Sequence, residues 1–127
     1  MQDKQLFEYA VIRVVPRVER EEFLNVGVIL FSKKLQFLET KFRINENRIK
    51  NFCPEIDIEI LQEHLNTFEK ICRGDKDSGP IGKLPLAERF RWLTATRSTI
   101  VQTSKTHPGF CKDPSETLAK LFEQLVL

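Results

Sequence analysis

Arginine and aromatic side chains alternate in one short stretch of the chain, and these residue types are suited to binding anions. Segment 88–98 contains Arg89, Phe90, Arg91, Trp92 and Arg97. Guanidinium groups form paired hydrogen bonds with carboxylates and phosphates, and an aromatic ring can stack on a nucleic-acid base. The stretch therefore predicts a binding surface for an anionic partner. The alternative is structural, because a helix of this composition can pack its rings on a sheet and leave its arginines in solvent.

The basic residues of the chain are concentrated around this stretch. Positions 79–112 carry six Lys and Arg against one acid, a formal charge of +5, within a whole chain of charge +2. The six are Lys83, Arg89, Arg91, Arg97, Lys105 and Lys112, and the acid is Glu88. Residues 1–78 hold thirteen basic and fourteen acidic side chains, and residues 113–127 hold one and three. A segregated charge of this kind predicts a basic surface that attracts phosphates or acidic protein surfaces.

A second group of polar residues lies inside the most apolar part of the sequence. Arg13, Glu22, Asn25 and Gly27 interrupt two runs that otherwise suit buried strands. A buried charge is costly unless it is paired, so Arg13 is expected to meet Glu22 or Asn25 across a hairpin. Such a cluster either fixes the strand register or lines a ligand pocket. Gly27 is expected at a bulge or at a close backbone approach.

No arrangement of residues indicates a metal, a phosphate loop or another cofactor. Three cysteines (Cys53, Cys72 and Cys111) and two histidines (His64 and His107) lack the close paired spacing of a zinc site. A cysteine nucleophile activated by His107 would need a third, orienting group, which the sequence does not identify. The spacing of the cysteines favours reduced thiols.

These residues must be positioned by a single domain, predicted to span residues 1–127. A chain of this length with 41% hydrophobic and 30% charged residues can bury a substantial core. No run of residues is apolar and long enough for a membrane helix, and no apolar signal region follows position 5. A cytoplasmic protein without membrane contact is therefore expected.

The predicted architecture is α+β, with an antiparallel sheet of about four strands. Apolar and β-branched runs predict strands over residues 7–15, 23–31 and 35–42, which form a three-strand meander, and a late strand over 98–104. A long middle helix follows Asp57 as N-cap and ends at Arg73 before Gly74. Short helices are predicted over 46–52 and 85–93, and Asp113, Pro114 and Glu116 predict the start of a C-terminal helix. The middle and C-terminal helices are expected to cover the sheet.

Several runs resemble one protein family. They are YAVIRVVP (9–16), EFLNVGVILF (22–31), RWLTATRS (91–98), GPIG (79–82), HPG (107–109) and DP (113–114). Together they resemble the bacterial domain-of-unknown-function family numbered 3037, over nearly the whole chain. The family pattern falls on Arg13, Glu22, Asn25, Gly27, Arg91, Trp92 and Arg97. Lys105 departs from it, because similar proteins often have proline there. The resemblance implies an accessory protein, similar to those often encoded beside a larger kinase-like protein of the toxin type.

Three functions are compatible with these patterns. The first is a non-catalytic protein-interaction module that presents residues 89–97 to an acidic or phosphorylated protein partner. The second is a nucleic-acid-binding domain that uses Arg89, Arg91, Trp92 and Arg97, with Trp92 stacking on bases. The third is a small enzyme with a pocket around Arg13, Glu22, Asn25 and Arg97, where a carboxylate and a guanidinium could polarise an anionic substrate. The sequence leaves the oligomeric state open.

Overall fold

A computed structural model describes residues 3–97 and 99–127. Five strands form one sheet: β1 (Gln5–Val14), β2 (Leu24–Ser32), β3 (Phe37–Phe42), β4 (Val101–Thr103) and β5 (His107–Cys111). Four α-helices accompany it: α1 (Glu46–Phe52), α2 (Ile58–Arg73), α3 (Leu86–Leu93) and α4 (Pro114–Leu125). Short 3-10 turns, η1 (Val18–Arg20) and η2 (Ile81–Lys83), lie in two of the connections. The predicted α+β class with an antiparallel sheet is confirmed.

The sheet begins as the predicted three-strand meander, in the order β3-β2-β1. Two strands then share the outer edge of β1, because β4 pairs with its residues 12–14 and β5 pairs with its residues 5–9. Ser104 lies between these two strands and exchanges two hydrogen bonds with Val11, each 2.8 Å long. The edge of β1 is therefore paired along almost its whole length.

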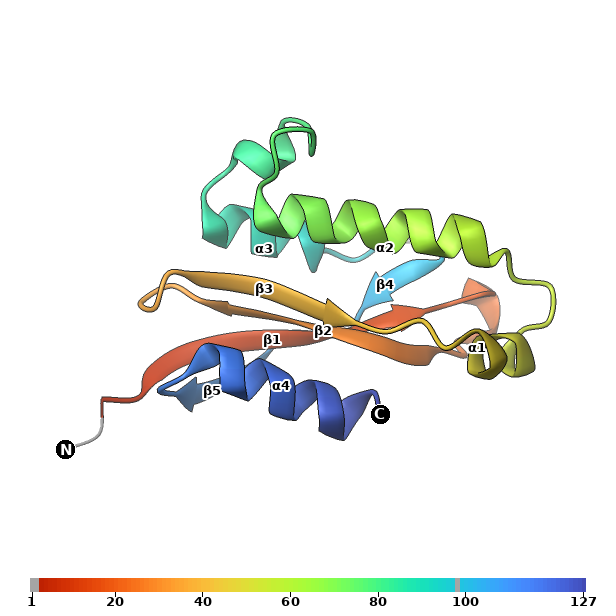
Figure 1. The fold of residues 1–127 in the computed structure, drawn as a ribbon, viewed down its shortest axis with the longest axis horizontal. Coiled ribbons are helices and arrows are strands. Elements are labelled where there is room, and N and C mark those ends of the chain that lie inside the picture. The colour runs from red at the N-terminus through yellow and green to blue at the C-terminus, as the bar shows by residue number, and fades with distance from the viewer. Residues whose placement is uncertain (1–2, 98) are drawn as a thin grey trace.

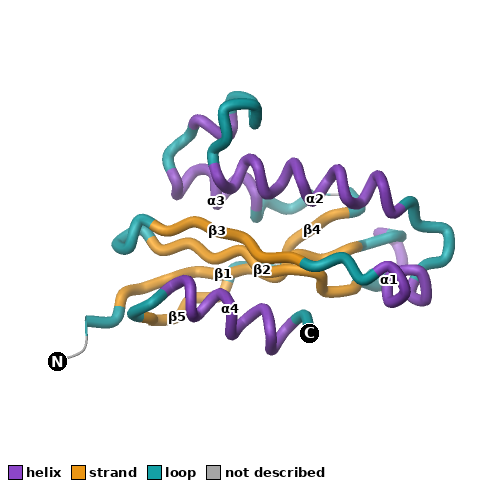
Figure 2. Tube along the Cα trace, viewed as in Figure 1, coloured by secondary structure: helices purple, strands orange, loops and turns teal. Residues whose placement is uncertain are grey.

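Helices cover both faces of the sheet, as Figures 1 and 2 show. Side chains from α2 and α3 pack with Ala10, Ile12 and Ile29 in the larger cluster of buried residues. On the opposite face, α4 contributes Leu118 and Phe122 to a smaller cluster that contains Phe7, Val28 and Leu30. Alternate residues of β1 and β2 are therefore buried on opposite faces, which explains why the sequence of β2 is almost continuously apolar.

A β-bulge in β2 changes the alternation of its side chains. Gly27 lies opposite Ile12, but the next pair is Asn25 with Arg13, so Val26 is the extra residue. Val26 packs in the α2-side cluster, and Asn25 on the other face donates its Nδ2 to the Leu125 carbonyl of α4 at 3.1 Å. The expected bulge and close approach at Gly27 are both observed, because a Cβ there would lie 2.7 Å from the Lys41 oxygen.

The helices begin and end at the residues that their capping signals predict. The Asp57 carboxylate accepts hydrogen bonds from the amides of Glu59 and Ile60 at 3.0 and 3.2 Å. Gly74 ends α2 in a left-handed conformation with φ of 71°, which glycine adopts without steric cost. Asp113 caps α4 by accepting from the Glu116 amide at 3.2 Å, and Pro114 is the first helical residue.

The late strand differs from the prediction. Ser98, its predicted first residue, lies outside the described residues, and β4 covers only Val101–Thr103. The sequence did not predict β5, because His107, Pro108 and Gly109 are turn-forming residues. They form a strand because Gly109 lies over Phe7, where a Cβ would be 2.5 Å from the ring. None of the helices in the described part of the chain is long and apolar enough to cross a membrane.

We predict that Gly27→Ala lowers the free energy of unfolding by about 2–3 kcal/mol, because the added Cβ would force β2 and β3 apart. Gly79→Ala is the control, since its Cβ would meet no atom within 4 Å but its φ is 82°. That variant should lose only about 1 kcal/mol through its left-handed backbone. Urea denaturation measures both variants, and an equal loss in the two would contradict the close approach at Gly27.

Candidate functional site

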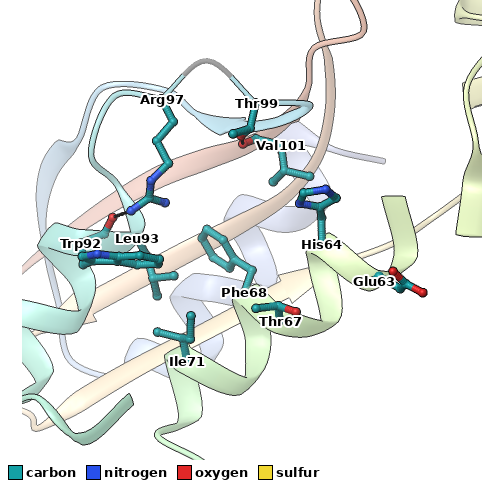
Figure 3. A pocket seen from close by; sticks show the side chains of 10 residues that line it. All are labelled: Glu63, His64, Thr67, Phe68, Ile71, Trp92, Leu93, Arg97, Thr99 and Val101. Atoms are coloured by element: carbon teal, nitrogen blue, oxygen red, sulfur yellow. Dashed lines mark hydrogen bonds between the residues drawn. The ribbon is translucent and has the colours of Figure 1, made fainter. Parts of the chain in front are cut away.

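A cavity of about 380 Å³ opens between α2, the end of α3 and the start of β4 (Figure 3). We call it the α2–α3 pocket. The α2 residues that line it are Glu63, His64, Thr67, Phe68 and Ile71, and the other lining residues are Trp92, Leu93, Arg97, Thr99 and Val101. The pocket therefore combines three elements that are distant in the sequence.

The floor of the pocket is apolar and its rim is polar. Phe68, Ile71, Leu93 and Val101 are each at most 8% exposed and belong to the main core cluster. His64 and Thr67 lie on the solvent side of the same helix, where their spacing of three residues places them on one face. A group that entered the pocket would meet hydrocarbon below and polar side chains at the entrance.

Arg97 stacks on Trp92 at one side of the entrance (Figure 3). Its guanidinium carbon lies 3.9 Å from the centre of the indole ring, and its NH2 group donates to the Trp92 carbonyl. This carbonyl belongs to the last turn of α3, where a cation interacts favourably with the helix dipole. The stacking and the hydrogen bond hold the guanidinium in one position.

Arg97 has no acidic partner among the described residues. Burial alone lowers the pKa of its guanidinium, because the charged form is partly desolvated. An arginine remains charged despite such a shift. The Arg97 side of the pocket entrance therefore carries a fixed positive charge that forms no ion pair in the described structure.

Arg91, in contrast, is neutralised by Glu8 of β1. Its NH1 and NH2 groups lie 2.9 and 2.7 Å from the two carboxylate oxygens, in a bidentate pair. This hydrogen bonding raises the pKa of the Arg91 guanidinium. Both side chains are partly in solvent, so the pair adds about 1 kcal/mol or less to stability. Its main consequence is that Arg91 contributes little net charge to a surface on α3.

Arg89 packs beneath the end of α2, although the sequence predicts a mostly outward side chain. It is half-buried, and its NH1 group is 3.4 Å from the Cys72 carbonyl. A Cβ at Gly74 would lie only 2.1 Å from the same NH1 group. The Arg89 Nε is buried without a hydrogen-bond partner in the described structure. These contacts place Arg89 in a structural position, at the end of a helix whose carbonyl groups attract a cation.

The structure brings Arg13 together with Asn25 and separates both from Glu22. Arg13 lies directly opposite Asn25 in the sheet, and its guanidinium carbon is 3.8 Å from the centre of the Phe23 ring. Within the described structure, Arg13 Nε and Asn25 Oδ1 are buried and have no hydrogen-bond partner. Burial lowers the pKa of Arg13. Glu22 instead pairs with Arg20, with Oε1 and Nε 2.6 Å apart.

Glu22 and Arg97 line different cavities. Glu22 lies in a cavity of about 260 Å³ together with Arg17, Arg20 and Cys53. Neither that cavity nor the α2–α3 pocket includes Arg13 or Asn25. Among the candidate site residues, Arg13 and Asn25 thus form a polar pair in the sheet, and Glu22 belongs to an exposed ion pair with Arg20. Arg89 and Arg91 contact other parts of the protein, and Arg97 stacks on Trp92.

No sequence pattern indicates the α2 side of the pocket. The sequence suggests His64 only as a candidate metal ligand. The described residues contain no cluster of three His, Cys, Asp or Glu side chains that could hold a metal ion. No local signal connects His64 or Thr67 with Arg97, because their proximity depends on how α2 and α3 pack on the sheet.

None of the three cysteines lines the α2–α3 pocket, and Cys72 is a poor nucleophile. Burial raises the pKa of the Cys72 thiol to about 12. Cys111 is also buried, and Cys53 is half-buried. His107 packs against Tyr9 with its ring tilted, and the ring centres are 5.3 Å apart. The reactive form of cysteine is the thiolate, so the environment of Cys72 works against covalent catalysis.

The fold and the site define a class: an α+β protein with helices on both faces of an antiparallel sheet and a small pocket with an apolar floor and a cationic entrance. The chain belongs to the family described as "Protein of unknown function (DUF3037)", whose model matches residues 9–126. The resemblance found in the sequence is thereby confirmed over the whole chain. No curated protein and no solved structure matches the chain.

We predict that Cys53 reacts first with a thiol reagent at pH 8, and that Cys72 and Cys111 react only when the protein unfolds. Labelling followed by peptide mass spectrometry measures each site. Cys53→Ser is the matched control, and it should remove the fast phase. A fast phase that persists in this variant would contradict the burial of the other two thiols.

The raised pKa of Cys72 also predicts a loss of stability at high pH. The thiol ionises near 9.0 when unfolded and near 12 when folded, so only the unfolded state releases its proton between these values. The free energy of unfolding should then fall by on the order of 1 kcal/mol per pH unit above pH 9 from this group. Urea denaturation of the wild type and of Cys72→Ala across this range isolates the contribution. If the free energy of unfolding fell equally steeply with pH in the two proteins, the contribution of Cys72 would be refuted.

Proposed function

We propose that this protein is a non-catalytic interaction module that binds an acidic or phosphorylated protein partner through the α2–α3 pocket and the Arg97–Trp92 stack at its entrance. The observation that supports the proposal is the uncompensated charge of Arg97. A desolvated guanidinium without a carboxylate is a cost to the isolated protein that an anionic partner would remove.

The composition and rigidity of the entrance also favour binding. Arginine and tryptophan are enriched among the residues that dominate the free energy of protein association, especially beside a pocket that excludes water. Trp92 is 39% exposed, so much of its ring remains available for contact. The Arg97 side chain is already held by the ring and by the Trp92 carbonyl. Less conformational entropy is therefore lost when a partner binds.

The hydroxyl groups at the pocket support binding rather than catalysis. Thr99 donates its hydroxyl to the Val101 carbonyl at 2.6 Å, which keeps that hydroxyl in a structural hydrogen bond. A nucleophilic hydroxyl instead requires an adjacent general base within hydrogen-bond reach. His64, a base on the rim, belongs to α2 and forms no hydrogen bond with Thr99 in the described structure.

Binding of nucleic acid through the same residues is the second candidate function. The Arg97–Trp92 stack favours it, because base stacking and phosphate contact commonly occur together. The pairing of Arg91 with Glu8 and the packing of Arg89 beneath Gly74 weigh against it. Fewer free cations mean fewer phosphate contacts, and those contacts supply most of the non-specific affinity. A protein partner is therefore the favoured candidate.

We predict that Arg97→Glu weakens binding of the protein partner by about 30-fold or more, which corresponds to loss of one dominant contact. The kinase-like protein implied by the family resemblance is the first partner to test, by calorimetry with both proteins purified. Proteins captured from the native cell extract come next. Arg91→Gln, on the helix α3 that precedes Arg97, is the matched control and should change affinity less than threefold, because Glu8 already neutralises Arg91.

Nuclease digestion and the salt dependence of the affinity distinguish the two candidate functions. A complex that survives nuclease digestion and loses affinity on Arg97→Glu supports the protein-interaction module. Retention of single-stranded DNA or RNA, with affinity that falls steeply as salt rises, would instead support nucleic-acid binding. Equal partner affinity of the wild type and of a folded Arg97→Glu protein would refute the proposed role of the pocket.

A further inference from the structure

We propose that the α2–α3 pocket receives one apolar side chain of the partner while Arg97 binds a carboxylate beside that side chain, so that the recognised segment is an acidic-hydrophobic peptide and not a phosphopeptide. This inference rests on the proposed function and specifies its ligand. It is carried by the apolar floor, the single cation, and the apolar surface on both sides of the pocket.

The floor of the pocket fits hydrocarbon. Phe68, Leu93 and Val101 present no side-chain hydrogen-bond donors or acceptors, and each is at most 8% exposed. Water in such a space finds few partners, so an apolar side chain that displaces it gains free energy. A cavity of about 380 Å³ has room for an aliphatic or aromatic side chain.

The charge at the entrance suits one negative charge. Phosphate groups carry a charge of about −1.5 to −2 and are usually bound by clusters of arginines. Among the described residues that line the pocket, Arg97 is the one Lys or Arg, and Glu63 adds a negative charge on the side opposite Arg97 (Figure 3). Arg91 pairs with Glu8 and Arg89 packs beneath Gly74, so neither adds to the charge of Arg97. With one arginine and one glutamate at the pocket, a singly charged carboxylate fits the local charge better than a phosphate, which carries more negative charge.

The remaining donors of Arg97 suit a planar anion. One face of the guanidinium stacks on Trp92, and the NH2 group binds the Trp92 carbonyl. The other nitrogen atoms form no hydrogen bonds within the described structure. They offer N–H groups in the guanidinium plane, which is the geometry that a carboxylate binds in paired hydrogen bonds.

Exposed apolar surface beyond the pocket indicates a peptide segment. Ile60 lies one turn before His64 on α2, about 6 Å along the helix, and is 47% exposed. Trp92, on the other side of the pocket, is 39% exposed. A free small molecule that filled the cavity would contact Trp92, which lines it, but would leave Ile60 in water. A peptide that crosses the entrance would cover them.

Trp92 is the single tryptophan of the chain, so intrinsic tryptophan fluorescence reports on this pocket directly. The probes are three blocked hexapeptides that differ in one residue and carry a central phenylalanine followed by aspartate, asparagine or phosphoserine. We predict that the aspartate peptide binds at least about fivefold more tightly than the asparagine peptide, because a hydrogen-bonded charge is lost in the latter. The phosphoserine peptide should bind no more tightly than the asparagine peptide.

Two variants assign the contacts. Arg97→Gln should remove the difference between the aspartate and asparagine peptides, and Arg91→Gln should preserve it. Thr67→Phe, which partly fills the pocket from α2 without touching Arg97, should weaken all three peptides alike. This second variant tests the pocket even if Arg97→Gln does not fold, and circular dichroism checks the folding of each.

Several outcomes would overturn the inference. Tightest binding of the phosphoserine peptide would do so and would leave the proposed function intact, because a phosphorylated partner would then be the ligand. Absence of saturable binding by any of the three peptides would also overturn it, as would tighter binding of free 3-phenylpropionate than of the aspartate peptide. The proposed function fails on different results, namely unchanged affinity of a folded Arg97→Glu protein for the protein partner or salt-sensitive retention of nucleic acid.

Discussion

Burial of β2 on both of its faces is the constraint that organises this fold. Five of its side chains, Val26, Val28, Ile29, Leu30 and Phe31, are nearly inaccessible to solvent. Their removal from water contributes on the order of 10 kcal/mol to folding, as an upper estimate. No single helix can cover two faces, so α2 and α3 pack on one side and α4 on the other. The α2–α3 pocket lies on this first side, between α2, the end of α3 and the start of β4.

The same constraint explains the bulge and the polar residues beside it. The extra residue at Val26 lets the side chains of Leu24 and Val26 reach the α2 side while Asn25 faces α4. Asn25 and Arg48 then bind the carbonyls of Leu125 and Val126 at 3.1 and 2.8 Å. Because these carbonyls have no partner within the helix, such contacts fix where α4 ends on the sheet.

A formal charge of +5 along a segment does not by itself make a basic surface. The three arginines of the 88–98 segment have different environments, since Arg91 pairs with Glu8, Arg89 packs beneath Gly74, and Arg97 stacks on Trp92. Arg89 and Arg91 lie two residues apart on α3, about 200° around the helix, so they meet different parts of the protein. Arg97 follows this helix and lies at the entrance of the α2–α3 pocket.

The sequence by itself determined the helices, the three-strand meander and the α+β class, because caps and periodicity are local signals. Asp57, Gly74 and Asp113 defined the helix ends to the residue, and the apolar runs of β1 and β2 defined the central hairpin. Strand β5 was missed, because its turn-forming residues pair with β1 only where Gly109 fits over Phe7. The partners of Glu22, Arg89 and Arg91, and the meeting of His64 with Arg97 at one pocket, were decided by the tertiary structure. These contacts join residues far apart in the chain, and their formation depends on how whole helices pack on the sheet.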